Sequence, residues 1–212
     1  MMITLYDYFR STASYRVRIA LNFKGLDYQL KEVHLVNNGG EQFSDGYKKL
    51  NPIARVPTLV DGDFVLSQSI AIIEYLDAKH PTNLLISSDI KLAAQVRAFS
   101  QIIACDIHPI NNLSVLKYLQ KDLGVSDEGK NKWYQHWIVI GFDAIEKILE
   151  SNAGKFCFGD SVTLADICLV AQVYNANRFS VPLDNYPHIC RINGNCLNLE
   201  EFKKASPDSY VS

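Results

Sequence analysis

Hydroxyl and basic side chains are concentrated where a short predicted strand passes into a predicted helix. Ser11, Thr12 and Ser14 lie within four positions, between Arg10 and Arg18. Backbone N–H groups and the positive end of the helix dipole converge at such a start, and both favour an anion. A thiol bound there would be stabilised as its thiolate, much as helix N-termini lower the pKa of cysteine. The alternative role of these hydroxyls is simply to cap the helix.

Two further segments could contact a ligand. Val56-Pro57 opens a predicted strand, and proline belongs at strand starts or edges because it donates no ladder hydrogen bond. A trans peptide bond is the commoner form there, whereas a cis bond would let the Val56 backbone pair with an extended peptide. Gln68-Ser69 begins a later helix, whose start suits a carboxylate, although Ser69 is equally a routine cap.

His108 and Arg178 are isolated candidates. His108 lies within a long helical pattern and precedes Pro109, which should kink the helix. A single histidine near an apolar face is more often a packed core residue than a catalyst. Arg178 follows a helix that opens with a capping box, Thr163 to Asp166. Its guanidinium could hold a carboxylate, or it could simply lie on the surface.

The first eighty residues alternate between strand and helix patterns. The order is β-α-β-α-β-β-α, which predicts a parallel crossover followed by an antiparallel hairpin. The predicted strands are residues 3–6, 28–35, 56–60 and 64–66, and the predicted helices are 17–24, 41–50 and 69–79.

His80-Pro81-Thr82-Asn83 interrupts this alternation, and helical periodicity dominates beyond it. We therefore predict an α/β domain over 1–82 and an all-helical domain over 88–212.

Composition excludes several classes of protein. The 212 residues are 48% hydrophobic with a net charge of −2, so no basic field recruits nucleic acid or an anionic membrane. No apolar run approaches the length of a membrane span, and the first residues do not read as a signal peptide. The five cysteines are scattered without metal spacing, which disfavours a bound metal and a disulfide framework. We expect a cytoplasmic protein.

Taken together, these segments resemble the cytosolic glutathione transferases over essentially the whole chain, and within them the zeta class. The resemblance is carried in the first half by residues 8–21, 50–52, 56–59 and 68–76, and in the second by 107–109, 112–116, 159–160, 163–166 and 178–179.

The resemblance implies a thioredoxin-like N-terminal domain, a helical C-terminal domain, a homodimer, and glutathione as cofactor. It implies a cis bond before Pro57, with the Val56 backbone pairing with the cysteinyl unit. Gln68 and Ser69 would hold the γ-glutamyl carboxylate. The remaining implied contacts are Ser11, Thr12, Ala13, Ser14, Tyr15 and Arg16 around the thiol, with Gln42, His108, Asn112 and Ser114.

The activity implied is glutathione-dependent cis-trans isomerisation of maleylacetoacetate to fumarylacetoacetate in phenylalanine and tyrosine breakdown. Ser11 would stabilise the thiolate with help from Thr12, and Arg178, with Arg10, would anchor the carboxylates of the substrate. Isomerisation of maleylpyruvate and conjugation of glutathione to electrophiles are alternatives, and a non-catalytic binding module is a third.

One position departs from the zeta pattern. Many members have Ser-Ser-Cys-Ser where this chain has Ser11-Thr12-Ala13-Ser14. A route through a protein thiol at position 13 is therefore closed. Isomerisation uses the sulfur of glutathione, so it survives this loss on chemical grounds.

Overall fold

The computed structural model describes residues 2–210, which form two compact units. One unit contains the described residues up to Leu84 together with those from Asn198 onward, and the other is Leu85–Leu197. The boundary after Leu84 falls in the stretch between the two predicted domains.

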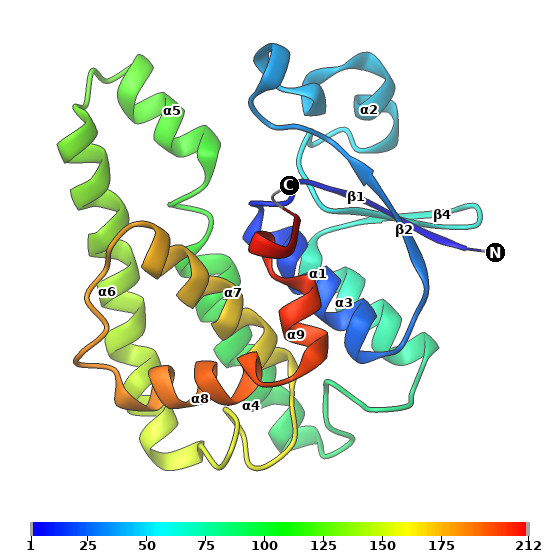
Figure 1. Cartoon of the computed structure of the whole chain (residues 1–212), viewed down its shortest axis with the longest axis vertical. Helices are drawn as coiled ribbons and strands as arrows, with labels where there is room; N and C mark the ends of the chain where they lie inside the picture. Colours follow the sequence, from blue (N-terminus) through cyan, green and yellow to red (C-terminus); the bar gives the residue numbers. More distant parts are fainter. Residues whose placement is uncertain (1, 211–212) are drawn as a thin grey trace. The chain divides into compact units, whose positions relative to one another are not determined.

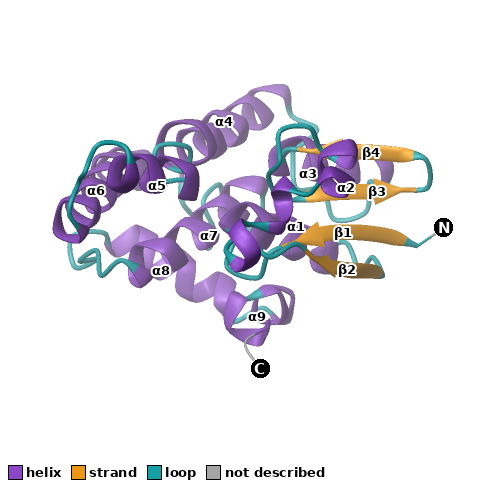
Figure 2. Cartoon of the chain, turned by 90° about the horizontal axis from the view of Figure 1, so that it is seen from above, coloured by secondary structure: helices purple, strands orange, loops and turns teal. Residues whose placement is uncertain are grey.

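The first unit is built on a four-stranded sheet in the order β2-β1-β3-β4 (Figure 2). β1 pairs in parallel with β2 and antiparallel with β3, and β3 pairs antiparallel with β4. The predicted crossover and hairpin are thus confirmed, as is the thioredoxin-like arrangement. The strands are β1 (Ile3–Asp7), β2 (Tyr28–Glu32), β3 (Thr58–Asp61) and β4 (Phe64–Ser67).

Helices cover both faces of this sheet. α1 and α3 lie side by side on one face, and α2 lies on the other (Figure 1). Leu5 of β1 and Leu59 of β3 are fully buried in register with each other, which places the core at the centre of the sheet. The helices are α1 (Thr12–Phe23), α2 (Asp45–Leu50) and α3 (Ser69–Lys79).

The predicted helix over 41–50 is in fact two elements. Glu41–Phe43 is a 3-10 turn, and α2 begins after Ser44, whose Oγ accepts a hydrogen bond from the Tyr47 N–H at 3.3 Å. Ser44 is extended, with φ −62° and ψ 147°, so the helix cannot run through it.

The C-terminal segment packs on α1, although the sequence prediction assigned residues 198–212 to the helical domain. α9 (Glu200–Ala205) lies against α1, where the Asn22 side chain donates to the Glu201 carbonyl at 3.1 Å. The Arg18 Nε donates to the Ala205 carbonyl at 2.9 Å. These bonds join residues about 180 positions apart, so no local pattern could have revealed them.

The second unit is helical, as predicted. His108 follows a π-helical segment (Ile102–Ile107), and Asp166 accepts hydrogen bonds from the Thr163 N–H and the Cys157 N–H, both at 2.8 Å, which confirms the capping box. The helices are α4 (Ile90–Gln101), α5 (Leu113–Lys121), α6 (Asp127–Asn152), α7 (Leu164–Arg178) and α8 (Pro187–Leu197).

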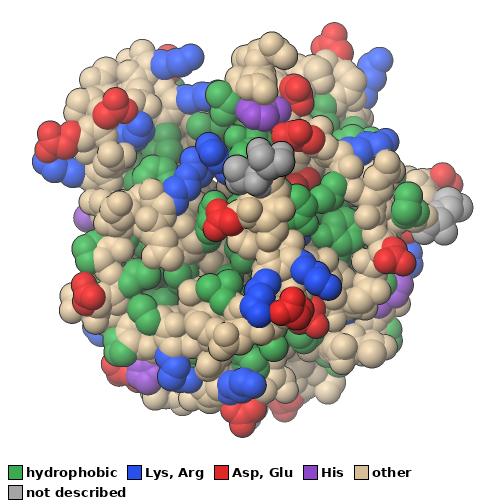
Figure 3. Space-filling view, in the orientation of Figure 1, with side chains coloured by type: hydrophobic (Ala, Val, Ile, Leu, Met, Phe, Trp, Pro, Cys, Tyr) green, Lys and Arg blue, Asp and Glu red, His purple; other side chains and the backbone are tan. Residues whose placement is uncertain are grey.

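Acidic and basic side chains are interspersed on the face seen in Figure 3, in keeping with the small net charge. Within residues 2–210, no helix combines the length and apolar character needed to cross a bilayer. The same residues contain no group of three or more His, Cys, Asp or Glu side chains placed to hold a metal ion.

Candidate functional site

Ser11 is the N-cap of α1, and its hydroxyl group can still donate a hydrogen bond. Its backbone is extended, with φ −73° and ψ 118°, and its Oγ accepts a hydrogen bond from the Ser14 N–H at 3.2 Å. Capping uses a lone pair of the hydroxyl, so the O–H remains able to donate to a ligand. The first turn of α1 carries no acidic side chain, so the positive end of its dipole is available to an external anion. The Ser11 hydroxyl can therefore cap the helix and help to bind an anion at the same time.

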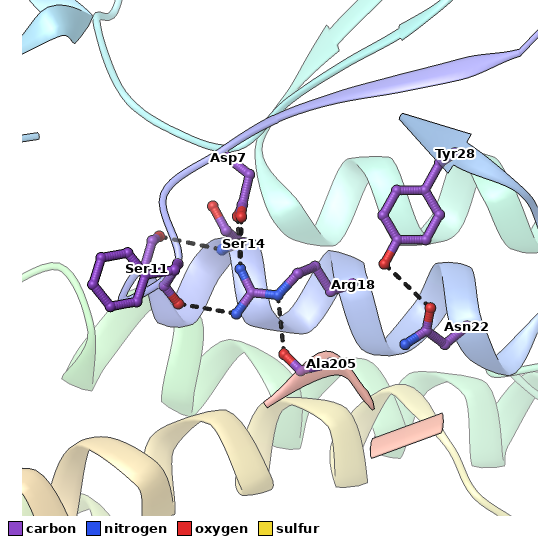
Figure 4. A network of polar contacts seen from close by, with 8 residues as sticks. Asp7, Ser11, Ser14, Arg18, Asn22, Tyr28 and Ala205 are labelled. Carbon is purple, nitrogen blue, oxygen red and sulfur yellow. Dashed lines mark hydrogen bonds and ion pairs between the residues drawn. The ribbon is translucent and has the colours of Figure 1, made fainter. Parts of the chain in front are cut away.

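A buried ion pair fixes the loop that carries Ser11. Arg18 Nη1 lies 2.7 Å and 2.9 Å from the two carboxylate oxygens of Asp7, and Arg18 Nη2 donates to the Phe9 carbonyl at 3.0 Å (Figure 4). Burial raises the pKa of the Asp7 carboxyl, and the Arg18 guanidinium opposes that rise. This pair could not be predicted from local sequence patterns, because it joins the end of β1 to the middle of α1.

The Val56-Pro57 peptide bond is cis, as the resemblance implied and contrary to the commoner trans form. The segment before it is held by two bonds to the Arg55 carbonyl, from the Tyr47 hydroxyl at 2.7 Å and the Asn51 amide at 2.8 Å. Within residues 2–210, the Val56 N–H and C=O form no hydrogen bond. The Val56 main chain can therefore pair with an extended ligand, because both its donor and its acceptor are unused.

Gln68 and Ser69 begin α3 in an unusual conformation. Gln68 has φ 73° and ψ 112°, which residues with a Cβ rarely adopt. Its side chain makes no capping bond to α3, and the first turn of this helix also lacks an acidic residue. The start of α3 is therefore available to a carboxylate.

Gln42 lies in the 3-10 turn before α2 and is only 5% exposed. Its Nε2 donates to the Leu35 carbonyl at 3.4 Å, while its Oε1 has no hydrogen-bond partner in the described chain. A Cβ at Gly40 would stand 2.5 Å from that Nε2, and Gly40 has φ +111°, so glycine is required beside this amide.

The sheet register brings four of these segments to one end of the sheet. β1 and β3 pair at Tyr6–Thr58, so the chain leaving β1 toward Ser11 runs beside the cis-proline segment. β3 and β4 pair at Thr58–Ser67, which places Gln68 next to Pro57. β2 ends in register with β1, so the loop carrying Gln42 starts from the same end. The predicted glutathione residues of this unit thus share one end of the sheet.

An open cavity of about 1070 Å³ lies in the same unit. It is lined by residues of β1, β2, α2 and the loop before α2, including Tyr6, Val33, Phe43 and Tyr47. Ser11, Val56 and Gln68 do not line it, although Tyr47, which does, donates to the Arg55 carbonyl just before Val56.

Arg178 is the last residue of α7, and its guanidinium lies over an aromatic ring. The sequence did not predict this contact. The Arg178 guanidinium lies 5.4 Å from the centre of the Phe179 ring, and Phe179 stacks on Tyr134 with ring centres 3.5 Å apart. Gln135 Nε2 donates to the Phe179 carbonyl at 2.8 Å. Arg178 is exposed and forms no ion pair within residues 2–210, so its donors are available to a carboxylate.

Two other predicted residues of the second unit, Asn112 and Ser114, are hydrogen-bonded to each other. Asn112 caps α5, and its Oδ1 accepts from both the N–H and the Oγ of Ser114 at 3.0 Å. His108 is half-buried at the end of the π-helical segment. Among the predicted residues, Ser11 is thus hydrogen-bonded to Ser14 and Tyr15, and Asn112 is hydrogen-bonded to Ser114.

A thioredoxin-like unit with a cis-proline, joined to a helical unit, is the architecture of a glutathione transferase. The family models agree: residues 1–78 match the glutathione S-transferase N-terminal domain, and residues 111–204 match the C-terminal domain. The chain is 48% identical to the probable maleylacetoacetate isomerase of Vibrio cholerae, over 99% of this chain and 97% of that one.

Solved structures show the same similarity. The chain matches a holo structure of a bacterial maleylpyruvate isomerase of the zeta class with a TM-score of 0.94 and 44% identity, over 97% of each chain. It matches the maleylacetoacetate isomerase of Methylobacterium extorquens AM1, solved with bound malonate and glutathione, with a TM-score of 0.92 and 33% identity over 96% of each chain. The chain belongs to the glutathione S-transferase family, and within it to the zeta class.

Proposed function

We propose that this protein isomerises maleylacetoacetate to fumarylacetoacetate with glutathione as cofactor. The observation that carries the proposal is the Ser11 hydroxyl at the start of α1, free to donate at a helix end whose dipole no acidic side chain offsets. The similarity to the Vibrio cholerae relative supports the choice of reaction. This activity would place the protein in the breakdown of phenylalanine and tyrosine.

The residues present fit glutathione. The unused Val56 main chain suits the cysteinyl unit of the tripeptide, because an extended peptide can pair with it as an added strand. The uncapped start of α3, at Gln68 and Ser69, suits the γ-glutamyl carboxylate. The unpartnered Gln42 Oε1 is a ready acceptor for an N–H group. We assign further contacts to His108, Asn112 and Ser114.

Ser11 and Thr12 activate the thiol in this proposal. The hydroxyl of Ser11 donates to the sulfur, and the dipole of α1 adds a second favourable interaction with its negative charge. Ala13, Ser14 and Tyr15 line the same turn without adding charge. Ala13 supplies no protein thiol, so the chemistry depends on the cofactor alone.

Glutathione, when bound, supplies a sulfur that adds reversibly to the cis double bond and so allows rotation about it. Arg178 holds a carboxylate of the substrate through its planar guanidinium, with Arg10 as a second anchor. Both arginines also offset the negative charge that grows on the substrate as the double bond is lost.

Maleylpyruvate is the second candidate substrate. It is favoured by one observation, the TM-score of 0.94 to a maleylpyruvate isomerase structure. Both substrates are cis-configured dicarboxylates, so the same residues would serve either. We further propose that the protein is a cytoplasmic homodimer.

The test is the ultraviolet-monitored isomerisation of maleylacetone and maleylpyruvate, each with and without glutathione. We expect turnover that requires glutathione and consumes no thiol. Faster turnover of maleylpyruvate would select the second candidate. If neither substrate is isomerised, and the glutathione thiol is consumed when a chloronitrobenzene is supplied, the protein is a conjugating transferase and the proposal is refuted.

A further inference from the structure

α1 contains two buried arginines that differ completely in their partners. Arg18 is fully buried, and its donors go to the Asp7 carboxylate and to the carbonyls of Phe9 and Ala205 (Figure 4). This arginine is part of the framework of the unit, because every bond it makes joins separate segments of the chain.

Arg16 is buried almost as deeply, with 3% of its surface exposed. Its Nε is inaccessible to solvent and has no hydrogen-bond partner among the described residues. Within residues 2–210, its guanidinium forms no ion pair and no hydrogen bond. A buried cation without a counter-charge is unfavourable, and proteins rarely keep one without a use for it.

Helix geometry directs Arg16 toward the start of α1. Residue 16 lies one turn after Thr12 on the same face of the helix, and helical side chains lean toward the N-terminal end. The side of α1 that meets α9 is occupied instead by Arg18 and Asn22, which bond to the α9 segment. Arg16 therefore lies on the same face of α1 as Thr12, about one turn from the helix end that Ser11 caps.

Nearby charges do not neutralise Arg16. Asp7 is engaged by Arg18, Arg10 lies over the Phe9 ring, and the first turn of α1 has no acidic residue. Within residues 2–210, Arg16 therefore has no paired counter-charge, and a bound anion could supply one.

We propose that the Arg16 guanidinium pairs with the sulfur of bound glutathione and holds it as the thiolate. This inference rests on the proposed function, which puts glutathione at this helix end. In that proposal Gln68 and Ser69 hold the γ-glutamyl carboxylate and Arg178 and Arg10 hold the substrate, while the glycyl carboxylate of glutathione has no assigned partner. The sulfur is the group that the proposed function places at the start of α1, beside Ser11. Its proton leaves to solvent as glutathione binds.

The test compares Arg16→Gln, which removes the charge, with Arg16→Lys, which keeps it. Lys31→Gln serves as control, because it removes one positive charge from an exposed position of β2. The readout is the thiolate absorbance of glutathione bound to each protein, followed as a function of pH. Thermal unfolding of each protein without glutathione is the second readout.

We expect the pKa of the bound thiol to be about one to three units higher in Arg16→Gln than in the wild type, the usual effect of one adjacent opposite charge. In Arg16→Lys the pKa of the bound thiol should stay close to the wild-type value. In Lys31→Gln it should equal the wild-type value. Without glutathione, Arg16→Gln should unfold at the wild-type temperature or above, because an unpaired buried charge has been removed.

An unchanged thiol pKa in Arg16→Gln would overturn the inference, as would unfolding of that variant at a clearly lower temperature. The proposed function fails separately. If the wild type lowers the thiol pKa through Arg16 but isomerises neither substrate, only the proposed reaction is wrong. If the wild type isomerises and Arg16→Gln leaves the thiol pKa unchanged, only the assignment of Arg16 is wrong. A wild type that binds no glutathione would overturn both.

Discussion

Ser11 is expected to have two separable roles, and three substitutions distinguish them. As the cap of α1 it accepts a hydrogen bond from the Ser14 N–H, and as the proposed activating group it donates to the sulfur. Ser11→Ala removes both functions. Ser11→Asp keeps the acceptor but introduces a negative charge and no donor at neutral pH. Ser11→Thr keeps both functions.

The magnitudes follow from the two hydrogen bonds. Loss of a cap costs about 1 kcal/mol, which lowers Tm by roughly 2–4 °C in a chain of this size. A hydrogen bond to a charged group contributes about 1.5–3 kcal/mol, so losing the bond to the thiolate should lower kcat/KM roughly 10- to 150-fold. Ser11→Ala should show both losses.

Ser11→Asp is the decisive variant. Aspartate caps a helix about as well as serine and complements the dipole, so its unfolding free energy should stay within about 0.5 kcal/mol of the wild type. Its carboxylate repels the thiolate, so its kcat/KM for isomerisation should fall below that of Ser11→Ala. Thermal unfolding without glutathione and the ultraviolet isomerisation assay measure the two quantities. A Ser11→Asp variant more active than Ser11→Ala, or a Ser11→Ala variant within twofold of the wild type, would refute the role of Ser11 as a donor to the thiolate.

Three further predictions concern other parts of the chain. Arg178→Ala should raise KM for the dicarboxylate and leave the affinity for glutathione nearly unchanged; loss of glutathione binding would contradict the assignment. Arg18→Gln should lower the unfolding free energy by about 3–5 kcal/mol, because it leaves the buried Asp7 carboxylate without its partner, and denaturant titration measures this. Burial raises the pKa of the Cys157 and Cys196 thiols, which lowers their thiolate fraction at neutral pH. Both should therefore resist alkylation in the folded protein while the exposed Cys105 reacts, as mass spectrometry after brief iodoacetamide treatment would show.

The parts of the fold that could be predicted from sequence are those that local residues determine. The Ser11 cap, the capping box of α7 and the hairpin of β3 and β4 each depend on residues within a few positions of one another. The same holds for the alternation of strands and helices in the first unit. Their physical basis is short-range, so the sequence alone was sufficient.

Long-range contacts account for what the sequence missed. The last residues read as one more helix of the second domain, yet hydrogen bonds to Asn22 and Arg18 join them to the first unit. The support for Arg178 depends on Tyr134, which stacks on Phe179 from another helix. Neither could be found from periodicity, because the partners are far apart in the chain.

The two arginines of α1 show most clearly why a site needs structure as well as pattern. Arg16 and Arg18 have the same chemistry, the same helix and almost the same burial. The sequence alone predicts a helix that starts with basic residues. It does not predict which of the two arginines forms an ion pair within the protein. Once Asp7 and two carbonyls are seen to account for Arg18, Arg16 is left as the buried charge of α1 that the described fold does not neutralise. A protein that stabilised only its own fold would gain by losing that charge, so its presence at the thiol end of α1 is best explained by an anion that arrives with the ligand.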